Sequence, residues 1–310
     1  MYDMIIVGAG TAGLTAGIYA LRSGVKPLIL ECEAMGGQIT LSPCVENYPG
    51  IAKISGMEFA DGLMAQLTNL GGEVTFGRVI STRKIDNGFE VCTEDGETYE
   101  GKNLIIASGA AHRHLGIERE QELIGRGVSY CATCDANFFE DFEVYVVGGG
   151  DSAVEEAMYL TKFARKVTII HRRDELRAAK SIQEKAFKNE KLHFMWDTVV
   201  EEVGGDGILS EMTVKNVKTG ELTKIVADED DGMFGVFGFI GTLPNSKIYE
   251  GTGLEMDERG YIPTDADMHT NIPGVFAAGD IRVKSLRQVV TAAADGAIAA
   301  TQAEKYINEL

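Results

Sequence analysis

Two cysteines separated by two residues, Cys131 and Cys134, form the most reactive arrangement in the sequence. This spacing serves either a disulfide that is repeatedly formed and broken or one half of a zinc site. A zinc site needs a second cysteine pair or suitably placed histidines. The other candidates are scattered singly or lie upstream without a cysteine pair: Cys32, Cys44, Cys92, His112 and His114. The spacing therefore favours a redox pair, and no metal site is expected.

Asp135 directly follows the second of these cysteines. A carboxylate at this position can exchange protons with a thiolate, which disulfide reduction requires. An aspartate here can also be a simple turn residue. We expect Asp135 to take part in the chemistry together with Cys131 and Cys134.

Two glycine-rich segments of the same design lie 140 residues apart, on either side of the cysteine pair. Residues 3–31 and residues 143–173 each read as strand, turn, helix and strand, with the helices expected from Leu14 and from Val154. The matching positions are Gly8 and Gly148, Gly10 and Gly150, Gly13 and Ala153, and Glu31 and His171. The correspondence indicates an internal repeat of a βαβ unit.

Turns of this kind cradle dinucleotides. The first glycine makes the tight bend, the second lets the backbone approach a pyrophosphate, and the third lets helix and strand pack closely. The helix N-terminus adds partial positive charge. A single such motif is weak evidence, because glycine turns also occur for structural reasons. Two of them, each between a strand and a helix, predict a permanently held flavin dinucleotide and a nicotinamide dinucleotide that comes and goes.

The residues at the ends of the second strands distinguish the two sites. Glu31 can accept hydrogen bonds from a ribose 2′-hydroxyl, which suits FAD or NAD. At the matching place the second unit carries His171, followed by Arg172, Arg173 and Arg177. Three guanidiniums there suit the 2′-phosphate of NADPH, although a basic cluster can also be a merely solvated face. In so acidic a chain we favour the phosphate.

The length and net charge of the chain limit the number of domains and the kinds of partner to be expected. The 310 residues are sufficient for two domains, and a formal charge of −18 would repel nucleic acid. The longest apolar runs fall far short of the roughly 20 residues that a membrane span needs, and the N-terminus opens directly into a strand. Five cysteines without a signal peptide indicate mostly free thiols. We expect a cytoplasmic protein that binds neither membrane nor nucleic acid.

Taken together, these motifs closely resemble the low-molecular-weight bacterial thioredoxin reductases, and the resemblance covers essentially the whole chain. The segments that carry it are 8–13, 36–38, 46–50, 131–135, 148–153, 171–177 and 274–280, which read GAGTAG, GGQ, ENYPG, CATCD, GGGDSA, HRRDELR and GVFAAGD.

The resemblance implies an α/β fold with two Rossmann-like dinucleotide-binding domains, the NADPH domain being inserted into the FAD domain. Residues 1–113 and 244–310 are expected to form the FAD-binding domain, and residues 114–243 the NADPH-binding domain with the redox disulfide. A homodimer with one FAD per subunit, NADPH as co-substrate and thioredoxin as partner is also implied.

The same resemblance assigns residues to the two cofactors. Besides Gly8, Gly10, Gly13 and Glu31, the flavin is expected to meet Gly37, Gln38, Asn47, Gly279, Asp280, Arg287, Gln288 and Val289. NADPH is expected to meet Gly148, Gly150, Asp151, Ser152, Ala153, His171, Arg172, Arg173 and Arg177. Asp280 would reach the ribityl chain.

The implied reaction is hydride transfer from NADPH to FAD, then reduction of the Cys131/Cys134 disulfide, then exchange with oxidised thioredoxin. By resemblance, Cys134 faces the flavin and Cys131 attacks the partner. The family rotates its inserted domain between two orientations, and the linkers near residues 112–117 and 241–247 are the hinge candidates.

Rival interpretations remain at this point. The chain could be a related flavoprotein that serves another protein carrier or takes electrons from ferredoxin, or a redox-sensing interaction protein. The arginines argue against a ferredoxin-dependent enzyme, and two complete nucleotide sites argue against a mere sensor. Gly238 lies inside an expected core strand, where a glycine costs packing, and the sequence gives it no role.

Overall fold

Both glycine-rich segments fold as strand, turn, helix and strand in the computed structural model, which describes residues 1–42 and 45–309. The first contains β1 (Tyr2–Val7), α1 (Thr11–Arg22) and β2 (Pro27–Glu31), and the second contains β9 (Glu143–Gly148), α5 (Asp151–Leu160) and β10 (Lys166–Ile170). Each helix begins three residues earlier than expected, because the residues after the second glycine already belong to its first turn.

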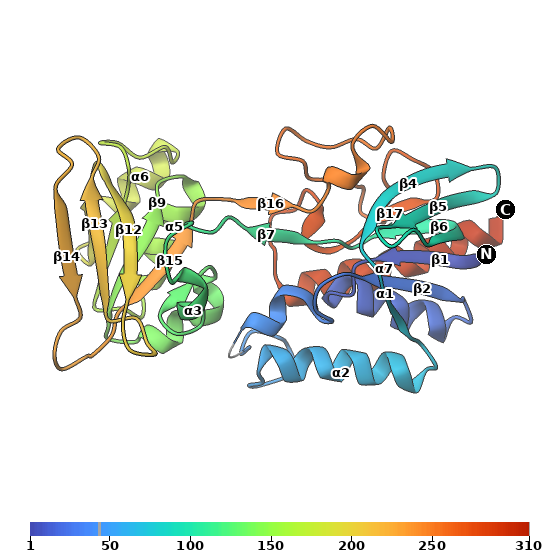
Figure 1. Ribbon diagram of the computed structural model, residues 1–310, viewed down its shortest axis with the longest axis horizontal. Coiled ribbons are helices and arrows are strands. Elements are labelled where there is room, and N and C mark those ends of the chain that lie inside the picture. Colours follow the sequence, from blue (N-terminus) through green and yellow to red (C-terminus); the bar gives the residue numbers. More distant parts are fainter. Residues whose placement is uncertain (43–44, 310) are drawn as a thin grey trace. The chain divides into compact units, whose positions relative to one another are not determined.

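The chain divides into two units, and the second interrupts the first. The first unit comprises Met1–Ala111 and Leu243–Leu310, and the second comprises His112–Thr242. The division lies two residues before the first expected domain boundary and one residue before the second. The two crossings of the chain are the short strands β7 (Ala110–His112) and β16 (Thr242–Pro244), which pair with each other (Figure 1).

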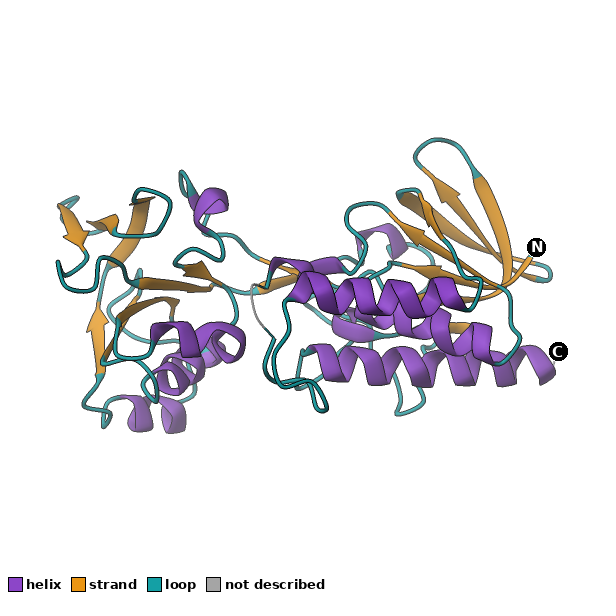
Figure 2. Ribbon diagram, turned by 90° about the horizontal axis from the view of Figure 1, so that it is seen from below, coloured by secondary structure: helices purple, strands orange, loops and turns teal. Residues whose placement is uncertain are grey.

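The first unit is built on a sheet whose parallel part runs β3 (Val74–Phe76), β2, β1, β6 (Thr98–Ile106) and β17 (Val275–Ala277). The earlier half of β6 pairs instead with β5 (Gly88–Thr93), which is antiparallel and pairs with β4 (Val79–Ile85). Three long helices, α1, α2 (Gly56–Asn69) and α7 (Val289–Glu309), run alongside one another (Figure 2).

Close packing of α1 against α7 requires a glycine. A Cβ at Gly296 would stand 2.1 Å from the carbonyl oxygen of Ala12, so only glycine lets the two helices approach this closely. The core beneath them is formed by side chains of β1, α1 and α7, including Met4, Leu14 and Ala299. The last helix of the chain thus closes the core that the first helix begins.

The second unit repeats this parallel arrangement in the order β11 (Leu192–Met195), β10, β9, β15 (Gly235–Phe239) and β8 (Val128–Ser129). A separate antiparallel sheet contains β12 (Thr198–Gly204), β13 (Glu211–Asn216) and β14 (Leu222–Val226). Short helices complete the unit: α3 (Glu120–Leu123), α4 (Ala132–Asp135) and α6 (Lys180–Ala186).

The internal repeat extends to strand register. Val7 pairs with Leu30 between β1 and β2, and Val147 pairs with Ile170 between β9 and β10, again with an offset of 140 residues. Parallel sheets with a glycine turn after the first strand of each βαβ unit are the Rossmann-like arrangement. The predicted α/β class is therefore confirmed. Among the described residues, no helix combines the length and apolar character needed to cross a membrane.

Candidate functional site

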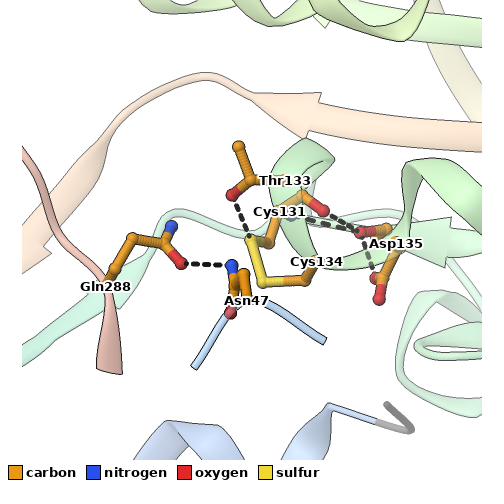
Figure 3. Close-up of a disulfide and its surroundings, with 7 residues drawn as sticks. Asn47, Cys131, Thr133, Cys134, Asp135 and Gln288 are labelled. Atoms are coloured by element: carbon orange, nitrogen blue, oxygen red, sulfur yellow. Dashed lines mark hydrogen bonds between the residues drawn. A yellow bond between two sulfur atoms is a disulfide. The ribbon is translucent and has the colours of Figure 1, made fainter. Parts of the chain in front are cut away.

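The second unit joins Cys131 and Cys134 in a disulfide at the start of α4 (Figure 3). Their Cα atoms are 5.3 Å apart, and both residues are half-buried. The hydroxyl of Thr133 lies 3.4 Å from Sγ of Cys131. A half-buried disulfide on one turn of helix remains open to a partner thiolate, as exchange requires.

The carboxyl group of Asp135 lies on the same turn and is mostly removed from water. Its Oδ2 accepts a hydrogen bond of 2.6 Å from the Ser129 hydroxyl, whereas Oδ1 is buried and has no hydrogen-bond partner among the described residues. Burial raises the pKa of Asp135 above its ordinary value, and the bond from Ser129 opposes this rise. A carboxyl group with a raised pKa can hold a proton beside the disulfide and release it.

Ser129 is a functional candidate that sequence reasoning missed. Its Oγ accepts from the backbone N–H of Cys131 at 3.1 Å while it donates to Asp135. One hydroxyl therefore connects the backbone of the first cysteine to the carboxyl group. A serine two residues before a C-x-x-C motif has no distinctive signal, since only the fold brings it back to Asp135.

We expect Asp135→Asn to make thiol–disulfide exchange slower by about 100-fold or more, because positioned acid–base groups contribute 10²–10⁴-fold.

The Asp135→Asn change should also increase the free energy of unfolding at neutral pH. A folded-state pKa raised above the unfolded value means that wild-type stability falls as pH rises through the folded pKa. Asparagine avoids that loss, so its advantage should appear above this pKa and vanish near pH 4. Denaturant unfolding across pH and single-turnover exchange measure the two effects, and a variant less stable at pH 7 than at pH 4, relative to wild type, contradicts the expectation.

The structure explains the glycine at position 238 by its contact with Tyr130, the residue before the first cysteine. A Cβ at Gly238 would stand 2.5 Å from the Tyr130 ring, so the glycine in β15 makes room for it. The ring also stacks on His112 with centroids 5.6 Å apart, and its hydroxyl accepts from the backbone N–H of Leu115. The packing cost of a glycine in a core strand is thus offset by a buried tyrosine.

The later part of the first hinge candidate, residues 112–117, is held by hydrogen bonds within the second unit. The buried carboxylate of Glu120 accepts from the backbone N–H groups of Leu115, Gly116 and Ile117, at 2.8, 2.8 and 3.3 Å. Three amides converging on one carboxylate form a strong charge-assisted arrangement. This part of the linker is therefore held by its own unit.

In the first unit the glycine turn has no room for side chains at two of its three glycines. A Cβ at Gly13 would lie 1.8 Å from the carbonyl oxygen of Gly8, and one at Gly8 would lie 2.4 Å from that of Ala107. Gly10 is different, because a Cβ there would meet nothing closer than 3.8 Å. The turn is thus tight on its protein side and open at its second glycine, where the backbone can approach a pyrophosphate.

The carboxylate of Glu31 points back to this turn. It accepts from the N–H of Ala9 at 2.7 Å, and from those of Cys32 and Glu33 at 2.8 Å each. A carboxylate has about four acceptor positions, so capacity for a further donor remains. The side chain is held at the end of β2, next to the mouth of the glycine turn.

Three further predicted residues of the first unit, Gly37, Gln38 and Asn47, are held by contacts within that unit. Gly36 donates its N–H to the carbonyl of Ala9, and Gly37 follows with a positive φ of 67°. Gln38 donates to the carbonyl of Ala110 at 2.7 Å. The amide of Asn47 donates to that of Gln288 at 3.1 Å (Figure 3), just before α7 begins at Val289.

Gly279–Ile281 forms one turn of 3-10 helix, called the Gly279–Asp280 loop below, and it presents an unsatisfied acceptor. Oδ1 of Asp280 is buried without a hydrogen-bond partner among the described residues, and burial raises the pKa of this carboxyl although Lys284 and Arg287 oppose the rise. Arg287 stacks on Tyr261 and donates to the carbonyl of Asp280. An orphaned acceptor beside an open glycine turn fits a dinucleotide that brings its own hydroxyl groups.

The second glycine turn is equally crowded on its protein side. A Cβ at Gly148 would stand 2.6 Å from that of Ala153, whereas one at Gly150 would meet nothing within 4 Å. Asp151 and Ser152 are exposed at the first turn of α5, and Oδ1 of Asp151 accepts from the N–H of Ala179. The open glycine at the start of a helix matches the first unit.

His171, like Glu31, lies against the residue after the first glycine of its turn, but it does so with a buried ring in place of a carboxylate. Its ring is buried against Gly149, where a Cβ would lie 2.3 Å from the ring, and Nε2 has no hydrogen-bond partner among the described residues. Burial lowers the pKa of His171, hydrogen bonding to the backbone of Glu175 and Gly148 opposes this, and Arg173 and Arg177 add a smaller lowering. The ring thus supports the turn by packing against it.

Three exposed guanidiniums follow His171. Arg172, Arg173 and Arg177 form no side-chain ion pair or hydrogen bond within residues 1–42 and 45–309. The backbone N–H of Arg177 donates to the carbonyl of Gly149 at 2.7 Å, which fixes this basic loop beside the turn. The loop can therefore offer three free cations to one anionic group.

The remaining side chains that could bind a metal do not cluster in the described residues. No group of three or more metal-binding side chains occurs in the part of the chain that the structure describes. Cys32 and Cys92 are free and half-buried, and burial raises the pKa of the Cys32 thiol. Cys44 lies outside the described residues.

Comparison with known proteins gives consistent results. The pyridine nucleotide-disulphide oxidoreductase family matches residues 2–296. A thioredoxin reductase of Peptoclostridium litorale is 58% identical over 100% of this chain and 98% of its own length, and that of Peptoclostridium acidaminophilum is 55% identical over 99% and 97%. The crystal structure of a Streptococcus pyogenes thioredoxin reductase superposes with a TM-score of 0.93 at 46% identity, covering 100% of this chain and 99% of that one.

Proposed function

The chain belongs to the thioredoxin reductases of the pyridine nucleotide-disulphide oxidoreductase family, and from this membership we propose that it is an NADPH-dependent thioredoxin-disulfide reductase whose Cys131–Cys134 pair exchanges with thioredoxin. The observation that carries the proposal is the half-buried disulfide with the buried carboxyl group of Asp135 on the same helical turn.

FAD is the proposed resident cofactor of the first unit. When bound, it supplies chemistry that side chains lack, since a flavin accepts a hydride and gives up electrons in pairs. The open backbone at Gly10 would receive its pyrophosphate, Glu31 its ribose, and the orphaned oxygen of Asp280 a hydroxyl of its ribityl chain. Gly37, Gln38, Asn47, Gln288 and Val289 would surround the remainder.

The exchange step uses groups of the second unit. The thiolate of reduced Cys131 attacks one sulfur of the partner's disulfide, and the other partner sulfur leaves as a thiolate that takes up a proton. The thiolate of Cys134 then attacks Sγ of Cys131, which restores the internal disulfide and releases the second partner thiolate. Asp135, held by Ser129, is the group placed to supply and remove protons on this turn.

NADPH is the proposed electron donor, bound at the second glycine turn. Gly150 and the first turn of α5 would receive the pyrophosphate, and Arg172, Arg173 and Arg177 the 2′-phosphate. The free state of these guanidiniums supports NADPH over NADH. We also propose a cytoplasmic homodimer, on the basis of the family resemblance.

One assay tests the function directly. Purified protein should carry flavin and sustain many turnovers of NADPH oxidation only when oxidised thioredoxin is added, with NADH much less effective. A matched mixture with ferredoxin as donor or with a hydroperoxide-reducing carrier as acceptor distinguishes the related flavoproteins. Sustained NADPH oxidation at the same rate without thioredoxin, or flavin-free folded protein that takes up no FAD, contradicts the proposal.

A further inference from the structure

A buried group of charged side chains lies directly behind the Gly279–Asp280 loop in the first unit. Asp295, on α7, is 6% exposed, Arg282 is 9% exposed, and the side chain of Lys284 is 9% exposed. Oδ1 of Asp295 lies 2.8 Å from Nη1 of Arg282, and Oδ2 lies 2.7 Å from Nζ of Lys284. A single carboxylate therefore holds two cations away from water.

The same carboxylate also holds the backbone of the loop. Oδ2 of Asp295 accepts from the N–H of Gly279 at 3.1 Å, and Gly279 has a positive φ of 81° that favours glycine. Arg287 donates to the carbonyls of Asp280 and Arg282, at 3.3 and 3.0 Å. The loop is thus fixed at the N–H of its first residue by Asp295 and at two of its carbonyl groups by Arg287.

The charge balance shows that this group does more than fasten α7 to the loop. Arg282 alone would neutralise Asp295, and it is further held by the Thr264 hydroxyl at 2.7 Å. Lys284 is a second cation. Burial raises the pKa of the otherwise unpartnered Asp280, the charges of Lys284 and Arg287 oppose this rise, and the charge of Asp295 adds to it. A purely structural ion pair has no need of the second cation, which is costly to bury.

We propose that Asp295 is a positioning residue for the flavin: through its bonds to Gly279 and Lys284 it fixes the conformation of the loop that presents the Asp280 side chain to a hydroxyl of the cofactor. This inference rests on the proposed function, in which FAD occupies the first unit. Asp295 itself touches protein groups and acts through the loop.

The test is the affinity of flavin-free protein for FAD, measured by quenching of flavin fluorescence rather than by turnover. Asp295→Asn should raise the dissociation constant on the order of 10-fold to 100-fold, because hydrogen bonds to a charged group are lost and two cations are left unpaired. Asn103→Ala is the matched control. It removes a buried bond from β6 to the carbonyl of Ala303 in α7 without touching the loop, so it should lower thermal stability and leave FAD affinity nearly unchanged.

Lys284→Gln provides a second variant that keeps Asp295 paired with Arg282 and Gly279. It should weaken FAD binding by several-fold, which is within the range of one charge-assisted contact, even if Asp295→Asn fails to fold. Wild-type affinity in either soluble variant, or an equal loss in Asn103→Ala, overturns the positioning role. Wild-type protein that binds no FAD at all overturns the proposed function instead, so the two failures are distinguishable.

Discussion

Replacing Cys134 by serine should reduce thioredoxin turnover to the background rate while NADPH still bleaches the flavin absorbance. Serine cannot form the disulfide that Cys131 and Cys134 make in the structure, and in the proposed function electrons leave through that pair. The remaining Cys131 can still attack thioredoxin, but no second thiolate can release it. We therefore expect the Cys134→Ser protein to accumulate as a covalent complex with thioredoxin on non-reducing gels.

Cys131→Ser should be equally inactive and yield little of that complex, because the attacking thiol is missing. Stopped-flow spectra give the flavin step and steady-state assays give turnover. Cys92→Ser is the matched control, since Cys92 is a free, half-buried thiol on β5 of the other unit, and it should behave as wild type. Near-normal turnover in either variant of the pair would show that electrons take another route.

Neutralising Arg172 and Arg173 together should lower kcat/KM for NADPH strongly and leave the poor use of NADH nearly unchanged. Only NADPH carries the phosphate that these guanidiniums would meet. A hydrogen bond to a charged group contributes roughly 1.5 to 3 kcal/mol net, so losing two should cost about 3 to 6 kcal/mol, or on the order of 100-fold to 10,000-fold in rate. Because both side chains are exposed, we expect the lower end.

Salt provides an independent check of this assignment. Attraction between exposed charges is screened within about 10 Å at 0.1 M ionic strength, so the wild-type preference for NADPH should shrink at high salt. Lys224→Gln is a control for loss of an exposed cation, since Lys224 pairs with Glu211 on the antiparallel sheet. Equal losses with NADPH and NADH would mean that the arginines support the fold, and the NADPH assignment would be withdrawn.

Much of the fold could be predicted because its signals are local in sequence. Glycines at Gly8 and Gly148 are required by positive φ angles of 105° and 157° within a few residues of their own strands, and apolar runs on either side identify those strands. The repeat at a constant offset then fixed the α/β class. Helix starts were placed too late because the glycine-rich residues were assigned wholly to the turn.

The features that sequence reasoning missed depend on residues that are distant along the chain. The glycine at position 238 leaves room for the ring of Tyr130. Asp295 is buried because it accepts from the N–H of Gly279 and pairs with Arg282 and Lys284. No periodicity or motif links such positions, since the contacts exist only once strands and helices pack. His171 matches Glu31 by position, and its ring packs against Gly149 where Glu31 accepts from Ala9, a contact that the sequence alone does not show.

The interruption of the first unit by the second has a consequence for synthesis on the ribosome. The second unit is one continuous stretch, and all of it is synthesised before β17 and α7, which the first unit needs to complete its sheet and core. Until then the apolar face of α1 and the later half of β6 lack their partners, and exposed surface of this kind invites aggregation. The first unit is therefore begun before the second unit but completed after it. A truncation within α7 should leave the first unit incomplete and the second unit intact.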